Sequence, residues 1–282
     1  MHPGSGGGSR MMSMSPKQML TLIIVVFSAL SFIKLLLLTT SSSNPHNRAS
    51  AWDAGGGNGT GDRGVLAPKE LALLRSLVAA RAPCRLLVFG LSPQLLALAA
   101  VNSGAGASSA FVTDIPEDAD AARLLSGDSE GVSVHVAWYH DAAAEAWPLL
   151  RRARGSPACR RPTGTVRKSG CHLALTSSLP REVLETRWDL VVVDGPSGGA
   201  PEEPGRMGTI YTAAALARAA VGSGEVVDVA VHDVDRTVER WYAWEYLCED
   251  NLVAAKGRLW HFRVTGGGPA DAFCTIGPVH IL

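Results

Sequence analysis

Short apolar runs alternate with stretches of helical periodicity along most of the chain after residue 65. The runs at 188–194 (WDLVVVD) and 85–90 (RLLVFG) have continuous apolar centres, which is typical of strands buried on both faces of a parallel sheet. The pattern predicts strands over 85–90, 109–114, 132–139, 188–194 and 226–232, and helices over 66–82, 93–102, 117–125, 141–154, 207–221 and 234–248. We expect antiparallel edge strands to close the sheet over 257–264 and 272–276.

Strands that alternate with helices predict an α/β fold with a mostly parallel, doubly wound sheet. Residues 155–187 break the alternation and are interpreted as an insertion. Ligands of such sheets bind beyond the carboxyl ends of the strands. Polar residues that follow the predicted strands are therefore the first candidates for a site.

The pattern near the N-terminus predicts a membrane anchor. Residues 19–40 are predominantly apolar and carry one charge, Lys34, and about 20 predominantly apolar residues are enough to cross a bilayer. We interpret 1–18 as a cytoplasmic tail, 19–40 as a transmembrane helix, 41–64 as a flexible lumenal stem and 65–282 as the lumenal domain. A cleaved signal peptide is the alternative, although no small-residue cleavage motif closes the run.

Five cysteines are present, and in an oxidising lumen some of them are expected to pair. A Cys159–Cys171 bond would close a loop rich in Arg, Pro and Gly, and Cys248–Cys274 is a second candidate pair. Cys84 would then remain as a buried thiol. The spacing of cysteines and histidines predicts no structural zinc site.

Charge excludes one class of partner. The chain has 26 basic and 26 acidic residues and a formal net charge of zero. Proteins that bind nucleic acid normally carry a basic excess, so we expect no nucleic-acid partner.

The first two predicted strands end in residues suited to a nucleotide-like cofactor. Gly90 and Ser92 lie in the turn after the first strand, where a glycine lets a cofactor approach the backbone. Asp114 follows Gly90 by 24 residues, and an acid at about this distance typically binds ribose hydroxyls. The structural alternatives are a tight turn at Gly90 and a helix cap at Asp114.

Titratable residues gather after two later strands. Asp194 ends the strand at 188–194, and a carboxylate there could act as a base, orient an acceptor or hold a metal. His232 and Asp233 follow the strand at 226–232, where His232 could serve as a general base. These side chains could also hold a divalent ion, but their spacing is not diagnostic. A turn aspartate at 194 and a helix cap at 233 are the structural alternatives.

Further charged residues suit an acidic acceptor. Arg206 precedes a predicted helix and could form a bidentate contact with the carboxylate of a uronic acid, or it could be an ordinary surface arginine. Asp235 and Arg236 follow His232 closely, and we assign them to the same acceptor site. Asp235 could instead cap the next helix.

Several motifs carry a family resemblance: LLVFGL (86–91), CHLAL (171–175), WDLVVVDGP (188–196), PGRM (204–207), VHDVDR (231–236), EYLC (245–248) and GRLWHF (257–262). Together the chain resembles the plant DUF579 family, which contains glucuronoxylan and arabinogalactan glucuronic acid 4-O-methyltransferases and irregular-xylem-type xylan biosynthesis proteins. The resemblance implies a Rossmann-like methyltransferase fold, S-adenosylmethionine as cofactor, and a single-pass type II protein of the Golgi membrane. It places Gly90 and Asp114 at the cofactor.

For the acceptor, the resemblance implies methyl transfer to O4 of glucuronic acid on a cell-wall polysaccharide. Asp194, His232 and Asp233 would lie near the acceptor hydroxyl, and Arg206 would pair with the uronate. Two motifs point to different branches of the family. VDGP, with Gly195, resembles the irregular-xylem branch, whereas VHDVDR resembles the methyltransferases.

Three functions are therefore compatible with the sequence. The first is an active polysaccharide O-methyltransferase. The second is a non-catalytic xylan biosynthesis factor of the same fold that acts through other Golgi proteins. The third is another nucleotide-dependent enzyme, such as a sugar-nucleotide oxidoreductase, although the chain lacks a complete G-x-G-x-x-G motif.

Overall fold

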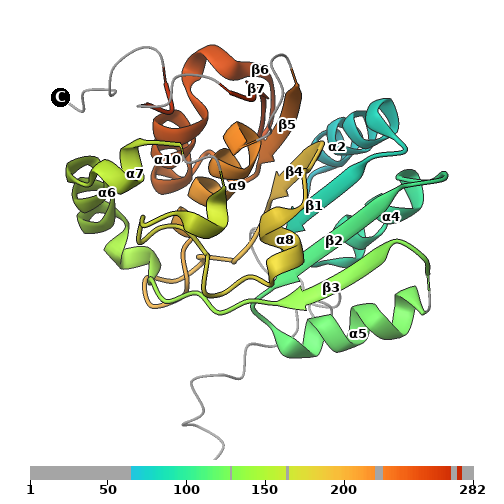
Figure 1. The fold of residues 1–282 in the computed structure, drawn as a ribbon. Coiled ribbons are helices and arrows are strands. Elements are labelled where there is room, and N and C mark those ends of the chain that lie inside the picture. The colour runs from blue at the N-terminus through green and yellow to red at the C-terminus, as the bar shows by residue number, and fades with distance from the viewer. Residues whose placement is uncertain (1–64, 128, 163–164, 220–224, 268–271, 275–282) are drawn as a thin grey trace, which may run out of the picture. The chain divides into compact units, whose positions relative to one another are not determined.

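The structure, a computed structural model, describes residues 65–127, 129–162, 165–219, 225–267 and 272–274 (Figure 1). The predicted tail, transmembrane helix and stem lie outside the described residues. Among the helices that are described, none combines the length and apolar character that crossing a membrane requires.

A seven-stranded sheet forms the centre of the domain, in the order β3-β2-β1-β4-β5-β7-β6. Its strands are β1 (Arg85–Phe89), β2 (Ser108–Thr113), β3 (Val132–Val136), β4 (Leu190–Val193), β5 (Val226–Val231), β6 (Leu252–Lys256) and β7 (Leu259–Thr265). Strands β1 to β5 are parallel, β7 pairs antiparallel with β5, and β6 pairs antiparallel with β7. Because β1 pairs with both β2 and β4, the strand order reverses there, which is where such sheets bind ligands.

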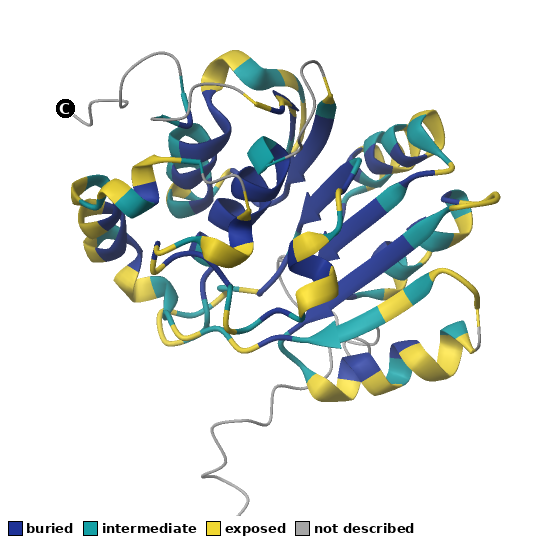
Figure 2. Ribbon diagram, viewed as in Figure 1, coloured by how far each residue is buried: buried dark blue, intermediate teal, exposed yellow. Residues whose placement is uncertain are grey.

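Helices cover both faces of the sheet (Figure 1). On one face lie α2 (Pro68–Arg81), α3 (Pro93–Leu96), α4 (Leu98–Val101) and α5 (Pro116–Ser126), and on the other α6 (Ala146–Gly155), α9 (Met207–Ala219) and α10 (Thr237–Leu247). Alternate strand residues enter two different cores, with Val88 and Val192 on the α2 side and Phe89 and Val193 on the α9 side. Figure 2 shows the central strands buried, while α5 and α6 expose their outer faces. The doubly wound, mostly parallel architecture is confirmed.

The edge of the sheet differs from the expectation. The strand predicted over 257–264 is β7, but residues 272–274 form no strand, and 275–276 lie outside the described residues. The second antiparallel strand is instead β6. Its pattern was missed because an edge strand is buried weakly, and none of its five residues is fully buried.

Several helices have different bounds from those expected. The predicted helix over 93–102 is two short helices, α3 and α4, and the helix predicted from 141 begins as a 3-10 turn at Ala143–Glu145 before α6. Helix α10 begins at Thr237, three residues later than predicted, because Arg236 is its N-cap and has an extended backbone with φ −73° and ψ 139°.

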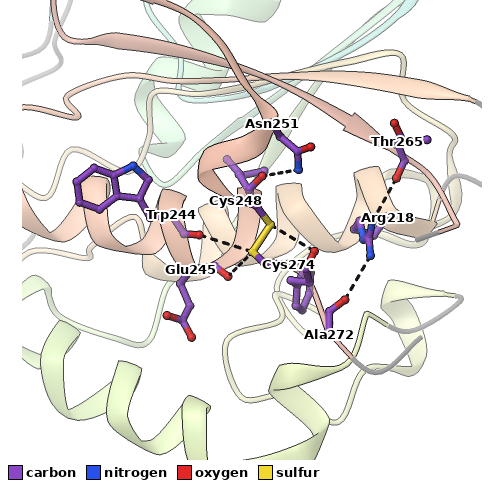
Figure 3. The surroundings of a disulfide bond; sticks show 10 residues. Arg218, Trp244, Glu245, Cys248, Asn251, Thr265, Ala272 and Cys274 are labelled. Atoms are coloured by element: carbon purple, nitrogen blue, oxygen red, sulfur yellow. Dashed lines mark hydrogen bonds between the residues drawn. A yellow bond between two sulfur atoms is a disulfide. The ribbon is translucent and has the colours of Figure 1, made fainter. Parts of the chain in front are cut away.

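The irregular stretch between α6 and β4 contains α7 (Pro157–Arg160), a 3-10 turn at Val166–Lys168 and α8 (Arg181–Glu185). A Cys159–Cys171 disulfide closes part of it, and a Cys248–Cys274 disulfide ties the chain near its described end to the end of α10 (Figure 3). Cys84 is a buried free thiol. Both predicted pairs and the unpaired cysteine are confirmed.

Candidate functional site

The carboxyl ends of β1 and β4 touch through their backbones. Gly90 follows β1 with a φ of +115°, and a Cβ at Gly90 would lie 3.0 Å from the carbonyl carbon of Asp194. A Cβ at Gly195 would lie 2.7 Å from the Gly90 Cα. Both positions therefore require glycine to let the two loops meet, so packing alone explains Gly90. Its contact with a cofactor stays a prediction.

A buried histidine links two carboxylates at this edge. His232, which follows β5, is fully buried, and its Nδ1 lies 2.7 Å from Oδ1 of Asp194. Its Nε2 lies 3.2 Å from Oε2 of Glu70, on the first turn of α2. Burial by itself lowers the pKa of His232, but the hydrogen bond and charge of Asp194 outweigh it, and the pKa is raised. A general base needs a free lone pair, so a base role does not fit this arrangement.

Glu70 is a site residue that the sequence reasoning missed. It is 1% exposed, and its carboxylate accepts hydrogen bonds from the backbone N–H groups of Ala67 and Arg258, each at 2.7 Å. Burial by itself raises the pKa of Glu70. These hydrogen bonds and the charge of His232 together have a larger opposite effect, so the pKa is lowered overall. A glutamate at the third position of a helix is typical of an N-terminal capping box, so the sequence could have indicated that Glu70 caps α2. The neighbouring residues give no indication that Glu70 contacts His232.

Asp233 holds three arginines together. It is fully buried, and its carboxylate lies 3.0 Å from Arg206, 3.0 Å from Arg236 and 2.8 Å from Arg258. Burial would raise the pKa of Asp233, but the surrounding cations lower it. This environment favours an ionised anchor for the arginines, and the predicted catalytic role of Asp233 remains untested.

Arg206 lies inside the protein, not at its surface. Its side chain is 1% exposed, and its guanidinium donates to the carbonyls of Pro196 at 2.8 Å and His232 at 3.0 Å. It also lies 3.4 Å from Asp194. A uronate could reach this group only if these contacts broke, so the geometry favours a role in holding the strand ends together.

Two of the remaining predicted acceptor residues lie at the surface. Asp235 is exposed, and the side chain of Arg236 is 24% exposed. Arg236 donates to the carbonyl of Ser197 at 2.7 Å, which ties it to the loop after β4. Of the two arginines assigned to the acceptor site, it is therefore the more accessible.

The cluster does not suit a divalent metal ion. Potential ligand atoms of Asp194, His232 and Asp233 lie within 4.8 Å of one another. However, both nitrogens of His232 face carboxylates, and the charge of Arg206 lies beside both aspartates. A metal ligand must offer a lone pair, and a second cation at this point would be repelled.

The predicted cofactor residues lie along the same edge. Ser92 caps α3 by accepting the N–H of Leu95 at 3.2 Å, and Asp114 follows β2, half-buried. Ile115 and not Asp114 is the N-cap of α5, so the capping alternative for Asp114 is wrong. Burial raises the pKa of Tyr139, as does the charge of Asp114, and the Tyr139 hydroxyl has no hydrogen-bond partner within the described ranges.

A hollow of about 420 Å³ lies elsewhere, at the amino ends of β2 and β3, where Asn102, Ser109 and Val132 line it. The side chains described above follow the carboxyl ends of the strands. The hollow is therefore separate from this site, and strand-end chemistry is the better guide to function.

The sequence profile of the IRX15/IRX15L/GXM family matches residues 69–262. The chain belongs to this family. Arabinogalactan O-methyltransferase 2 of Arabidopsis thaliana is 37% identical over 73% of this chain and 71% of its own length. Glucuronoxylan 4-O-methyltransferase 1 of the same plant is 37% identical, over 69% of this chain and 66% of its own.

A third family member, Protein IRREGULAR XYLEM 15 of Arabidopsis thaliana, is also 37% identical. The match covers 64% of this chain and 54% of the relative's length. The family predicted from the motifs is thus confirmed. Among solved structures, an O-methyltransferase from Bacillus cereus in complex with SAH aligns with 72% of this chain and 83% of its own, at 12% identity and a TM-score of 0.42. A likeness this weak supports no conclusion about the site.

Proposed function

We propose that the chain transfers a methyl group from S-adenosylmethionine to O4 of glucuronic acid side chains on glucuronoxylan or arabinogalactan. The supporting observation is the position of Asp194 at the end of β4, in a family whose relatives include O-methyltransferases named for these polysaccharides. Both named acceptors suit a site that pairs a carboxylate with accessible arginine.

Asp194 would take the proton of the acceptor hydroxyl. Its Oδ1 contacts His232 and Arg206. Within the described part of the chain, Oδ2 accepts no hydrogen bond. That second oxygen is available to accept the O4 proton as the new O–C bond forms. Arg236, at the rim of the cluster, would pair with the uronate, and Asp235 beside it would accept sugar hydroxyls.

When bound, S-adenosylmethionine supplies the electrophilic methyl group. Its ribose suits the end of β2, where Asp114 can accept hydrogen bonds and the unpartnered hydroxyl of Tyr139 can donate or accept one. Gly90 and Ser92 lie in the turn between β1 and α3, next to the switch point of the sheet. These residues would hold and orient the cofactor.

The proposed location is the Golgi lumen, with residues 19–40 as a type II signal anchor. Two disulfides support an oxidising compartment, because such bonds are rare in the cytosol. The acceptor and the Golgi membrane would be the partners of the chain.

A second function has support from the comparisons. Protein IRREGULAR XYLEM 15 is as similar in identity as the two methyltransferases, and its name states no activity. The chain could thus be a non-catalytic xylan biosynthesis factor that works through other Golgi proteins. Methyl transfer by the purified protein separates this possibility from the first.

The test is an assay of the full chain, made in a secretory host and purified in detergent. Labelled methyl should pass from S-adenosylmethionine to unmethylated glucuronoxylan or arabinogalactan, but not to either polymer after its uronates are reduced to neutral sugars. The Asp194→Asn variant is the matched control, since it removes the carboxylate and keeps the volume. Failure of the folded wild-type protein to label either polymer would favour the non-catalytic function.

A further inference from the structure

The contacts of His232 define its protonation state. A neutral imidazole carries one N–H and one lone pair, but here both nitrogens face carboxylate oxygens, at 2.7 Å and 3.2 Å. A lone pair directed at either oxygen would be repelled. Either the ring carries both protons, or one carboxyl group is itself protonated.

The surroundings of Glu70 favour an ionised carboxylate on that side. Oε2 accepts the N–H of Ala67 and Oε1 accepts the N–H of Arg258, so both oxygens already act as acceptors. The carboxylate is the stronger acceptor for these two N–H groups, so both hydrogen bonds stabilise the ionised form over the protonated one. On the other side, Oδ1 of Asp194 lies 3.4 Å from the guanidinium of Arg206 as well as 2.7 Å from Nδ1 of His232, so cationic or N–H groups face this oxygen from two sides.

We propose that Glu70, His232 and Asp194 form a buried carboxylate–imidazolium–carboxylate chain, in which Glu70 keeps His232 doubly protonated and His232 positions Asp194. His232 is then a positioning residue, not the base. It binds Oδ1 of Asp194 and leaves Oδ2 without a hydrogen bond among the described residues. This assignment rests on the proposed function only where it concerns the acceptor.

Other charged groups near the ring do not change this assignment. Asp233 Oδ1 lies 3.6 Å from Nδ1 and adds a third negative charge, whereas Arg206 opposes protonation. Arg258 donates its backbone N–H to Glu70, and its guanidinium pairs with Asp233. Its charge therefore contacts a carboxylate and not the imidazole ring. A Cβ at Gly257 would collide with the Glu70 carboxylate, so the turn before Arg258 is shaped around this side chain.

The first test is side-chain ¹⁵N NMR of the full chain labelled at its eight histidines, with His232→Asn to assign the signal. We expect both His232 nitrogens to stay protonated from pH 5.5 to 8.5. In Glu70→Gln the introduced amide can donate to Nε2, so one nitrogen should lose its proton at pH 7.5. Glu249→Gln, at an exposed site, should leave the signal unchanged. A neutral His232 in the wild-type protein would overturn the proposal.

The second test compares turnover in variants that still fold. Asp194→Asn should lower kcat by about 10²-fold or more, the usual scale for loss of a general base. His232→Gln keeps a donor toward Asp194 and should retain at least about tenfold more kcat than Asp194→Asn, with unchanged affinity for S-adenosylmethionine. Equal loss in both variants would make His232 the base. If the wild-type protein transfers no methyl group, the proposed function fails, but the NMR result still decides the protonation of His232.

Discussion

Gly90 and Gly195 lie in direct backbone contact, so that a Cβ added to Gly195 would approach the Gly90 nitrogen to 2.8 Å. The contact joins the loops after β1 and β4, on either side of the switch point of the sheet. Asp194 precedes one of these glycines, so its position depends on this contact. The VDGP motif that resembled the irregular-xylem branch thus has a structural reason for its glycine.

Gly195→Ala should destabilise the fold by about 1–3 kcal/mol, because neither backbone can move away without disturbing a central strand. Gly155→Ala is the matched control, since no atom lies within 4 Å of its added Cβ at the end of α6. The control should be neutral or slightly stabilising. Urea unfolding of both variants measures the difference, and equal free energies of unfolding would refute the contact.

Arg206→Lys should destabilise the fold by roughly 2–4 kcal/mol. A lysine cannot reproduce a fork that reaches Pro196, His232 and Asp233 together, and it leaves buried acceptors and a buried carboxylate poorly paired. Arg151→Lys, at an exposed position on α6, should change little. Thermal unfolding compares the two. A stable Arg206→Lys protein that fails only on uronate acceptors would restore the acceptor role predicted from the sequence.

The disulfide pairing predicts a definite thiol count. Of five cysteines, only Cys84 is free, so alkylation after denaturation without reductant should modify one thiol per chain. After reduction, all five should react, as intact mass would show. The Cys248→Ser variant should lose about 2–4 kcal/mol of stability and expose Cys274 to alkylation. A second reactive thiol in the wild-type protein would contradict the pairing.

Stability should depend on pH in opposite directions on the two sides of neutrality. The pKa of His232 is raised above its ordinary 6.5, so its contribution is complete below pH 6.5 and declines as the pH rises toward the folded pKa. The pKa of Glu70 is lowered from 4.5, so its contribution is complete above pH 4.5 and is lost as the pH falls through the folded pKa.

Urea unfolding between pH 3 and 9 measures this profile. His232→Asn should remove most of the decline on the alkaline side, since asparagine does not titrate. His135→Asn is the control, because burial lowers the pKa of that histidine and its effect has the opposite sign. An unchanged alkaline limb in His232→Asn would show that another group controls it.

The sequence predicted the sheet better than the site. β4 was clear because burial on both faces produces a continuous apolar run, whereas β6 was missed because an edge strand lacks one. Burial of Glu70 and Arg206 could not be predicted, since charged residues are rarely buried and the partners of these two come from distant segments. The strand-end rule nevertheless brought Asp194 and His232 together, because parallel strands end at a common edge.

The hydroxyl of Tyr139 provides the last prediction. It is buried without a hydrogen-bond partner in the described part of the chain, and such a group costs about 1–3 kcal/mol. Tyr139→Phe should therefore leave the ligand-free protein as stable as before or more stable. If the hydroxyl contacts S-adenosylmethionine, the same variant should bind the cofactor about tenfold more weakly, because the net contribution of one hydrogen bond is about 1.4 kcal/mol at most.

Calorimetric titration of S-adenosylmethionine into the full chain measures the cofactor affinity. The Asp114→Ala variant should bind the cofactor more weakly by about 1–3 kcal/mol, because it loses charge-assisted hydrogen bonds to the ribose. Glu117→Ala, exposed on the first turn of α5, should not. Weaker binding in both Tyr139→Phe and Asp114→Ala would place the ribose at the end of β2. If affinity is unchanged in both, the cofactor does not bind there, because the only polar groups offered to the ribose by this proposal would have been removed.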